Sequence, residues 1–114
     1  MIEDPTFTAE KSWLEDMTPA IAVKISAPSY EVNVGLRLEE VGMLPAILST
    51  SWKTGAKPVG RSAGAHVFWS CDDGMVSLGI GHDDQTWDVG ISFSAEAFHR
   101  MLAAIQHEIG AHRS

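Results

Sequence analysis

The chain contains a single cysteine among its 114 residues. One cysteine excludes an internal disulfide framework and any zinc site built from several thiolates. Cys71 stands in an alternating apolar pattern, so we expect it to be a small buried side chain. Because 45% of the residues are apolar, the chain can build a core without covalent staples. We expect one domain that spans residues 1–114.

Long apolar runs and a recognisable targeting segment are also missing. The first residues are acidic, and the first apolar run is too short to cross a bilayer. No internal repeat or low-complexity tract is visible. The sequence therefore predicts a folded protein of the cytoplasm.

Basic residues are scarce. Eight Lys and Arg against 15 Asp and Glu give a formal net charge of −7, which makes nucleic acids and anionic membranes poor partners. The charge is unevenly distributed along the chain. Residues 72–88 carry five aspartates and no basic residue, whereas residues 53–61 carry three basic residues and no acid.

The most regular stretch begins at residue 65 and predicts a β-hairpin. Asp73-Gly74 lies between two apolar runs and is a typical two-residue hairpin turn. The register that this turn sets puts six side chains on one face: Val67, Trp69, Cys71, Val76, Leu78 and Ile80.

A second hairpin follows. We place its turn at Asp83-Asp84, which pairs Ile80 with Trp87 and Leu78 with Val89. The third strand then extends the same apolar face. A loop longer by two residues would change the pairs but keep the face, because side chains alternate with a period of two.

After Ser94 the apolar spacing becomes helical. Ser94 is a suitable N-cap, and Glu96 suits the first turn and can pair with Arg100. Five apolar side chains share one stripe: Phe98, Met101, Leu102, Ile105 and Ile109. We expect Gly110 just beyond the end of the helix, and we expect the helix to pack on the apolar face of the sheet.

The rest of the chain completes the expected fold. In chain order we predict a short helix over 9–17, a strand over 21–25, a strand over 30–38 and a short helix over 44–52. Residues 53–64 predict a flexible basic loop. The fold class is α+β, an antiparallel sheet of about five strands with a C-terminal amphipathic helix and shorter helices packed on one face.

No pattern predicts an enzyme or a bound cofactor. His82, Asp83, Asp84 and Asp88 have metal-binding side chains, but neighbours in a turn or strand point in different directions, so we expect no metal site. We expect the three histidines near the C-terminus to lie on the protein surface. The serines are scattered, and the spacing of a nucleophile elbow is absent. We therefore predict no catalytic residues.

Two binding surfaces remain as candidates. Lys57 and Arg61 form a weak candidate for anion binding, because the glycines beside them lack the spacing of a phosphate loop. On the outer face of the sheet, Phe68 and Asp88 share a row with Gly79 in the predicted register. Glycine often marks the close approach of another molecule. The alternative is that the 9–17 helix or the 53–64 loop covers this row.

Three classes of function follow. The first is a small acidic protein-binding module, an inhibitor or immunity-type antagonist, whose Asp83, Asp84, Asp88 and Phe68 bind a basic surface of a partner protein. Small proteins of mobile elements and toxin–immunity pairs often have this size and charge. The second is a homo-oligomeric or complex-subunit domain. The third is a small-ligand or phosphate-binding protein that uses the 53–64 loop.

Overall fold

A computed structural model describes residues 4–14, 16–81 and 87–111, with the backbone alone for Trp87, Asp88 and Ala111. Seven strands form one antiparallel sheet in chain order. They are β1 (Thr6–Trp13), β2 (Pro19–Ala27), β3 (Tyr30–Arg37), β4 (Lys57–Ser62), β5 (Ala65–Asp72), β6 (Met75–Gly81) and β7 (Trp87–Ser94). The helical segments are α1 (Leu38–Val41), the 3-10 turns η1 (Leu44–Ser49) and η2 (Trp52–Thr54), and α2 (Ala95–Ala111).

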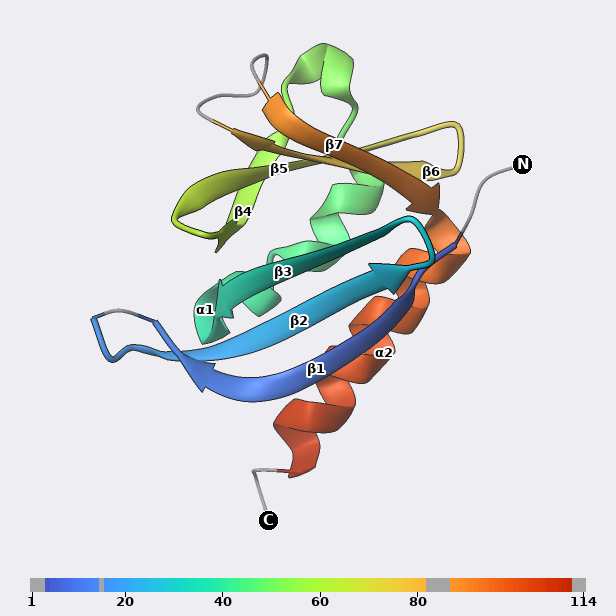
Figure 1. Cartoon of the computed structure of the whole chain (residues 1–114). Helices are drawn as coiled ribbons and strands as arrows, with labels where there is room; N and C mark the ends of the chain where they lie inside the picture. The colour runs from blue at the N-terminus through green and yellow to red at the C-terminus, as the bar shows by residue number, and fades with distance from the viewer. Residues whose placement is uncertain (1–3, 15, 82–86, 112–114) are drawn as a thin grey trace.

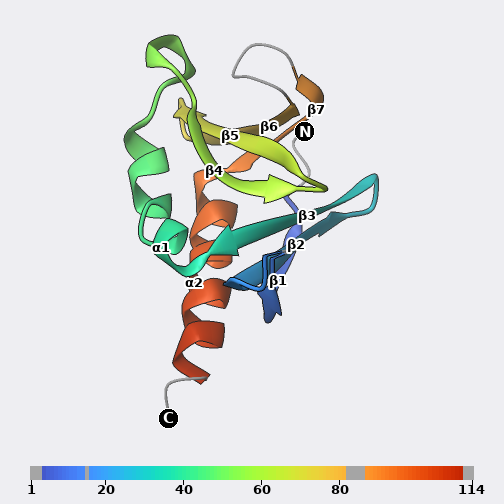
Figure 2. The same cartoon turned by 90° about the vertical axis from the view of Figure 1, so that its left-hand side faces the viewer.

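The sheet is strongly bent. β1 to β3 form its lower part and β4 to β7 its upper part, with α2 running down behind them (Figures 1 and 2). The two parts meet where β3 pairs with β4 through one residue pair, Gly35 and Arg61. Both parts turn their apolar face inward and share one core, in which Trp69, Phe93 and Phe98 are the largest fully buried side chains.

The first predicted hairpin is confirmed. β5 pairs with β6 from Asp72–Met75 to His66–Gly81, and Asp73 and Gly74 both have positive φ, as the two-residue turn requires. All the predicted core-face positions of these strands lie on the inner face, although Cys71 is only partly buried.

The second hairpin keeps the predicted face, but the predicted pairs are wrong by two residues. Ile80 pairs with Val89 and Leu78 with Ile91. The register shifts between Ile80 and Gly81, so that Trp87 pairs with the outer-face residue Gly81 and not with Ile80. An extra residue in β7 at this point accounts for one of the two residues, and the five-residue connection between Gly81 and Trp87 accounts for the other. The sequence pattern reveals neither.

The C-terminal helix is confirmed. The Ser94 hydroxyl oxygen accepts the amide hydrogen of Ala97 at 3.0 Å, which makes Ser94 the N-cap. Glu96 and Arg100 lie 3.8 Å apart. The predicted stripe faces the core, where Phe98, Met101 and Ile105 are fully buried. One detail is wrong: Gly110 lies inside α2, which continues to Ala111.

Two predicted segments have a different structure. The expected helix over 9–17 is strand β1, because the free edge of β2 offers a partner for eight consecutive residues. The expected loop over 53–64 contains β4, which pairs with β3 and β5. These two strands raise the number from about five to seven. The helix expected over 44–52 is a 3-10 turn with Pro45 in its first turn.

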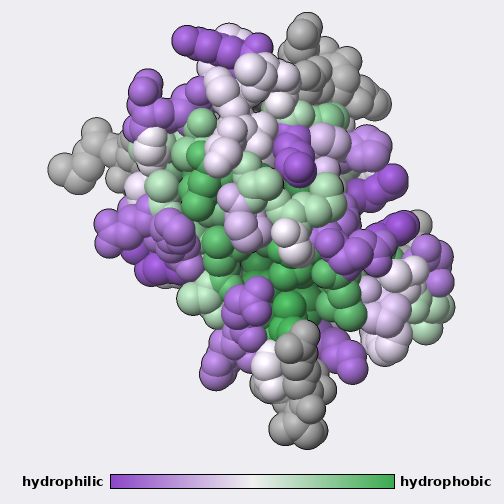
Figure 3. All heavy atoms as spheres, turned by 180° about the vertical axis from the view of Figure 1, so that it is seen from behind, coloured by the Kyte–Doolittle hydropathy of each residue, from purple (hydrophilic) through white to green (hydrophobic). Residues whose placement is uncertain are grey.

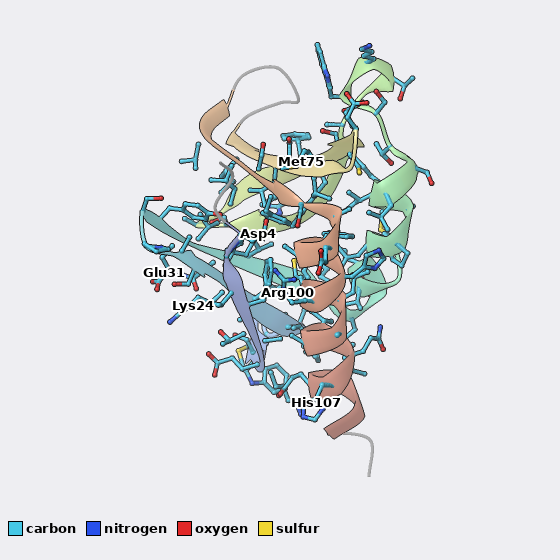
Figure 4. All side chains as sticks on the ribbon, turned by 90° about the vertical axis from the view of Figure 1, so that its right-hand side faces the viewer. Asp4, Lys24, Glu31, Met75, Arg100 and His107 are labelled. Carbon is cyan, nitrogen blue, oxygen red and sulfur yellow. The ribbon has the colours of Figure 1, made fainter. Side chains whose placement is uncertain are left out.

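α2 and the N-terminal residues cover the edge of the sheet at β1. The Lys11 amide donates to the Glu108 carboxylate at 3.2 Å, and the Phe7 and Phe93 rings meet edge to face at 5.4 Å. Asp4 accepts hydrogen bonds from the Ser94 amide and hydroxyl at 3.0 and 2.9 Å. Arg100 lies 3.7 Å from Asp4. Figure 4 labels both residues, Arg100 on the upper part of α2 and Asp4 beside it.

The back of the molecule shows apolar side chains in its lower half, close to the end of α2 (Figure 3). Leu102 and Ile109 of α2 are partly buried members of the core cluster. Among the described residues, no helix is long and apolar enough to cross a membrane.

Candidate interaction surface on the outer face of the sheet

A shallow open groove crosses the outer face where β3 meets β4. Small residues form its floor: Ala22, Gly35 and Gly60. Polar and charged side chains from five segments form its walls: Asp16, Asn33, Arg37, Glu39, Glu40, Arg61 and His66. We call this feature the outer groove.

Gly60 allows β4 to approach β3 closely at the outer groove. It has φ +80°, and a Cβ atom there would lie 2.8 Å from Leu36 Cδ2 and 2.9 Å from Val34 Cγ1. Only glycine fits this backbone and this close approach of β4 to β3. The Glu40 carboxylate joins the two strands, since it accepts the Arg37 amide at 2.9 Å and the Gly60 amide at 2.8 Å. Glu40 is therefore used inside the protein.

The turn between β1 and β2 forms one wall. The Leu14 side chain approaches within 3.5 Å of the position that a Cβ of Gly35 would take. Asp16 accepts the Thr18 amide at 3.0 Å and lies 3.8 Å from Arg37. Hydrogen bonds from Thr18, and more weakly the charge of Arg37, lower the pKa of the Asp16 carboxyl. These contacts hold the carboxylate form of Asp16.

Arg61, His66 and Phe68 form the opposite wall and its border. Arg61 pairs with His66 across β4 and β5, and the rings of His66 and Phe68 lie 6.0 Å apart. Arg61 is exposed and has no ion pair among the described residues. Phe68 is partly buried. The predicted surface around Phe68 therefore borders a groove that also carries the exposed guanidinium of Arg61, and the sequence pattern did not indicate this groove.

The row predicted around Phe68 is wrong in one member. Phe68 pairs with Gly79, and Gly79 pairs with Gly90, not with Asp88. The cause is the same shift of two residues in β7. Gly79 and Gly81 are buried while Gly90 is exposed, so the hollow expected beside Phe68 is open only at β7. The expected cover by a 9–17 helix is excluded, because residues 9–13 belong to strand β1.

The structure separates the two basic residues of the weak anion site. Lys57 pairs with the inner-face residue Trp69, whereas Arg61 pairs with the outer-face residue His66. The register of β4, with its irregularity between Pro58 and Arg61, thus assigns them to opposite faces. The two cations do not converge.

The acidic residues fall into two groups. Asp83 and Asp84 lie outside the described residues, as does the side chain of Asp88. The segment that carries them starts after Gly81, which pairs with His66 at the same end of the sheet as Phe68. Asp72 lies at the other end and is used internally, since it accepts the Ser51 hydroxyl at 2.7 Å and the Trp52 amide at 3.2 Å.

Two exposed tryptophans were missed in the sequence. Trp52 is 62% exposed on η2 and Trp13 is 55% exposed at the end of β1. Trp13 lies near Lys11, whose ammonium is 5.9 Å from the ring centroid. The only signal for Trp52 was its place between a serine and the basic segment, which is too weak to separate an exposed ring from a buried one.

The described residues show no arrangement typical of covalent or metal chemistry. No three His, Cys, Asp or Glu side chains gather as a metal site would require in these parts of the chain. Burial and the neighbouring Asp72 raise the pKa of the Cys71 thiol, which disfavours the reactive thiolate. What the outer groove offers is a set of hydrogen-bonding and charged groups beside a partly buried ring, as in protein recognition.

Comparisons with protein-family models, with curated proteins and with solved structures found no match for the chain.

Proposed function

We propose that the chain is a small acidic protein-binding module of the inhibitor or immunity type. It binds a basic surface of a partner protein, for example the nucleic-acid groove of a nuclease, through Asp83, Asp84 and Asp88, with Phe68 at the border of the contact. The observation that carries the proposal is the attachment of the acidic segment next to Gly81, opposite His66 and two residues from Phe68 in the strand.

Asp72 already accepts hydrogen bonds within the protein, which supports Asp83, Asp84 and Asp88 as the acids that bind the partner. Of the five aspartates of residues 72–88, Asp72 and Asp73 lie where β5 leads into β6, and the other three follow the end of β6 at Gly81 in the sequence. At one end the Asp72 carboxylate is bonded to the segment before η2, so its contacts are already made within the protein. The acids near residue 83 follow Gly81 in the sequence, and Gly81 pairs with His66 at the end of β5 that also carries Phe68.

Charge and aromatic contact have different roles in this proposal. A net charge of −7 attracts a basic partner over a distance and raises the rate of encounter. Affinity then depends on a few side chains that lose water at the centre of the contact, and a partly buried aromatic ring is a typical one. Phe68 is preorganised, because β4 and β6 flank it on both sides.

The outer groove limits how the partner can dock. Arg61 has no ion pair among the described residues and would repel a uniformly basic surface. We therefore place the partner over the β6–β7 end of the outer face, with Arg61 at the rim. The ligand-binding alternative is weaker, because Lys57 and Arg61 belong to opposite faces.

The test is an affinity pull-down from host lysate, read by mass spectrometry. The wild type is compared with a triple variant, Asp83→Ser, Asp84→Ser and Asp88→Ser. A matched variant replaces three exposed acids elsewhere, Glu10, Glu31 and Glu96, by serine and changes the net charge by the same three units.

The proposal expects one basic protein that the wild type and the matched variant capture and the aspartate variant does not. If both variants lose capture to the same extent, only the total charge matters. If both variants capture the partner as well as the wild type does, the contact lies elsewhere on the protein.

A further inference from the structure

The two edge strands of the sheet, β1 and β7, differ in what packs against them. At β1, the helix α2 packs along the strand and Glu108 accepts the Lys11 amide. At β7, the one described strand that pairs with it is β6. Figure 4 shows β7 along the border of the upper part of the sheet.

The pairing of β5 with β6 fixes which backbone groups of β7 point outward. Asp72 and Met75 flank a two-residue turn, so they exchange hydrogen bonds, and every second residue of β6 from Met75 bonds toward β5. The residues between them bond toward β7, where their partners are Val89, Ile91 and Phe93. The backbone groups of the alternate residues therefore point away from the sheet.

Those alternate residues are Gly90, Ser92 and Ser94. The Ser94 amide donates to Asp4 outside the sheet, as this geometry requires, so that position is occupied. The amides of Gly90 and Ser92 have no acceptor within the part of the chain that the structure describes, and both residues are exposed. β7 thus presents two outward N–H groups and two outward C=O groups, ready to pair with another strand.

The strand also lacks the usual protection of a free edge. It contains no Lys, Arg or Pro, which often prevent edge-to-edge pairing. Val89 is 43% exposed and Ile91 is partly buried on the inner side of the same strand. An exposed β-branched side chain beside free backbone groups favours the addition of a strand.

We propose that β7 pairs in antiparallel orientation with β7 of a second copy, about a two-fold axis at Ile91. This axis places Gly90 of each copy opposite Ser92 of the other, so that the outward groups form four hydrogen bonds across the interface. The two Ile91 residues meet at the axis, and Val89 is placed beside residue 93 of the other copy.

The strand is self-complementary in this register. The pair at the axis is two β-branched apolar residues in a non-hydrogen-bonded site, where side chains lie closest. Gly90 has no side chain to oppose Ser92. The one charged residue of the strand, Asp88, is placed opposite residue 94 and not opposite itself, at the end where Asp4 of the other copy binds Ser94 and lies 3.7 Å from Arg100. A second copy is therefore the partner that the edge fits.

The proposed dimer has a salt dependence opposite to that of the binding proposed above. Each copy carries a net charge of −7, so salt screens their repulsion and tightens the dimer. Binding of the acidic surface to a basic partner weakens with salt. The pairing depends on the backbone of Gly90 and Ser92, and the binding proposal depends on Phe68 and the aspartates of residues 83–84. Only Asp88 belongs to both, so the opposite salt dependence and the Gly90→Pro variant tell the failure of one proposal from the failure of the other.

Two measurements on the full chain test the pairing. Sedimentation equilibrium is recorded from about 1 µM to about 1 mM protein, the range of weak association. Amide hydrogen exchange by NMR is recorded at both ends of this range. We expect a monomer–dimer equilibrium, and we expect the Gly90 and Ser92 amides to become at least fivefold slower to exchange at the high concentration.

Variants separate this edge from other surfaces. Gly90→Pro removes an outward donor without removing a bond to β6, and we expect at least tenfold weaker association. Val89→Lys is a second variant, and it should also weaken association. Met43→Lys changes an apolar residue of similar exposure (38%) on another surface, so this matched control should dimerise as the wild type does.

A protein that stays monomeric throughout the range would overturn the proposal. So would a dimer in which the exchange of Gly90 and Ser92 does not change, because the contact would then lie on another surface. The exchange measurement on the wild type decides the question even if Gly90→Pro does not fold.

Discussion

Replacing Gly60 by alanine tests the packing at the junction of β3 and β4 that forms the outer groove. Gly60 has φ +80°, and the added Cβ would meet Leu36, Val34 and the Gly35 carbonyl at 2.8, 2.9 and 3.0 Å. An L-residue in left-handed conformation costs about 1–2 kcal/mol. Overpacking against buried side chains adds about 1–3 kcal/mol. We expect a total loss of about 2–5 kcal/mol.

Gly64→Ala is the matched control. Gly64 has φ +84°, but nothing lies within 4 Å of the position of its Cβ. This variant should lose only the conformational cost of about 1–2 kcal/mol. The difference between the two variants isolates the close approach of the strands.

The assay is urea unfolding followed by tryptophan fluorescence, with a comparison of midpoints at equal slope. The wild-type stability of a domain this size, about 5–15 kcal/mol, leaves room to measure both losses. Equal losses for Gly60→Ala and Gly64→Ala would refute the reasoning, because they would show that Leu36 and Val34 move aside at no cost.

Three further predictions concern stability, each measured by urea unfolding. Ser94→Ala removes the N-cap of α2 and should cost about 1 kcal/mol; no loss would mean that the cap is redundant. Hydrogen bonds from Ser94, and secondarily the Arg100 charge, lower the pKa of Asp4 from its usual 3.8. Ionised Asp4 therefore stabilises the folded state above pH 3.8, and this contribution is lost as the pH falls below that value. The stability advantage of the wild type over Asp4→Asn should therefore shrink in acid; an advantage independent of pH would contradict this. Trp69→Phe leaves a buried carbonyl of β4 unpaired and should cost about 2–4 kcal/mol, whereas Trp52→Phe at an exposed ring should change stability by less than about 0.5 kcal/mol; equal effects would contradict the assigned burial.

The parts of the fold that local sequence determines were predictable. The Asp73-Gly74 turn fixes the register of β5 and β6, because a two-residue turn leaves no freedom in the pairing. Ser94 and the helical spacing after it fix the start and the buried face of α2. Each of these features depends on residues within one or two turns of chain.

The errors arose where a distant partner decides the structure. Residues 9–17 have a pattern that a helix could use, yet β2 offers them a ladder of hydrogen bonds. β4 has the lysines, glycines and proline of a loop and becomes a strand between β3 and β5. The pairs of β6 and β7 differ from the predicted ones by two residues, which keeps the hydrophobic face, because the extra residue in β7 adds to a longer connection after Gly81.

The candidate site also combines a feature that local sequence determines with one that depends on distant contacts. The outer-face position of Phe68 follows from the alternation of β5 and was predictable. The outer groove was not, because it depends on the contact of Glu40 with Gly60, 20 residues further on, and on the turn that brings Leu14 over Gly35. Such contacts have no local signature in the sequence.

The most direct test of the proposed function is the affinity for the captured partner as a function of salt concentration, measured for the wild type and for the Asp83, Asp84 and Asp88 variant. We predict that wild-type affinity falls steeply with salt, and that the variant binds more weakly with a shallower slope. Affinity independent of salt, or the same slope for both proteins, would contradict recognition through this acidic surface.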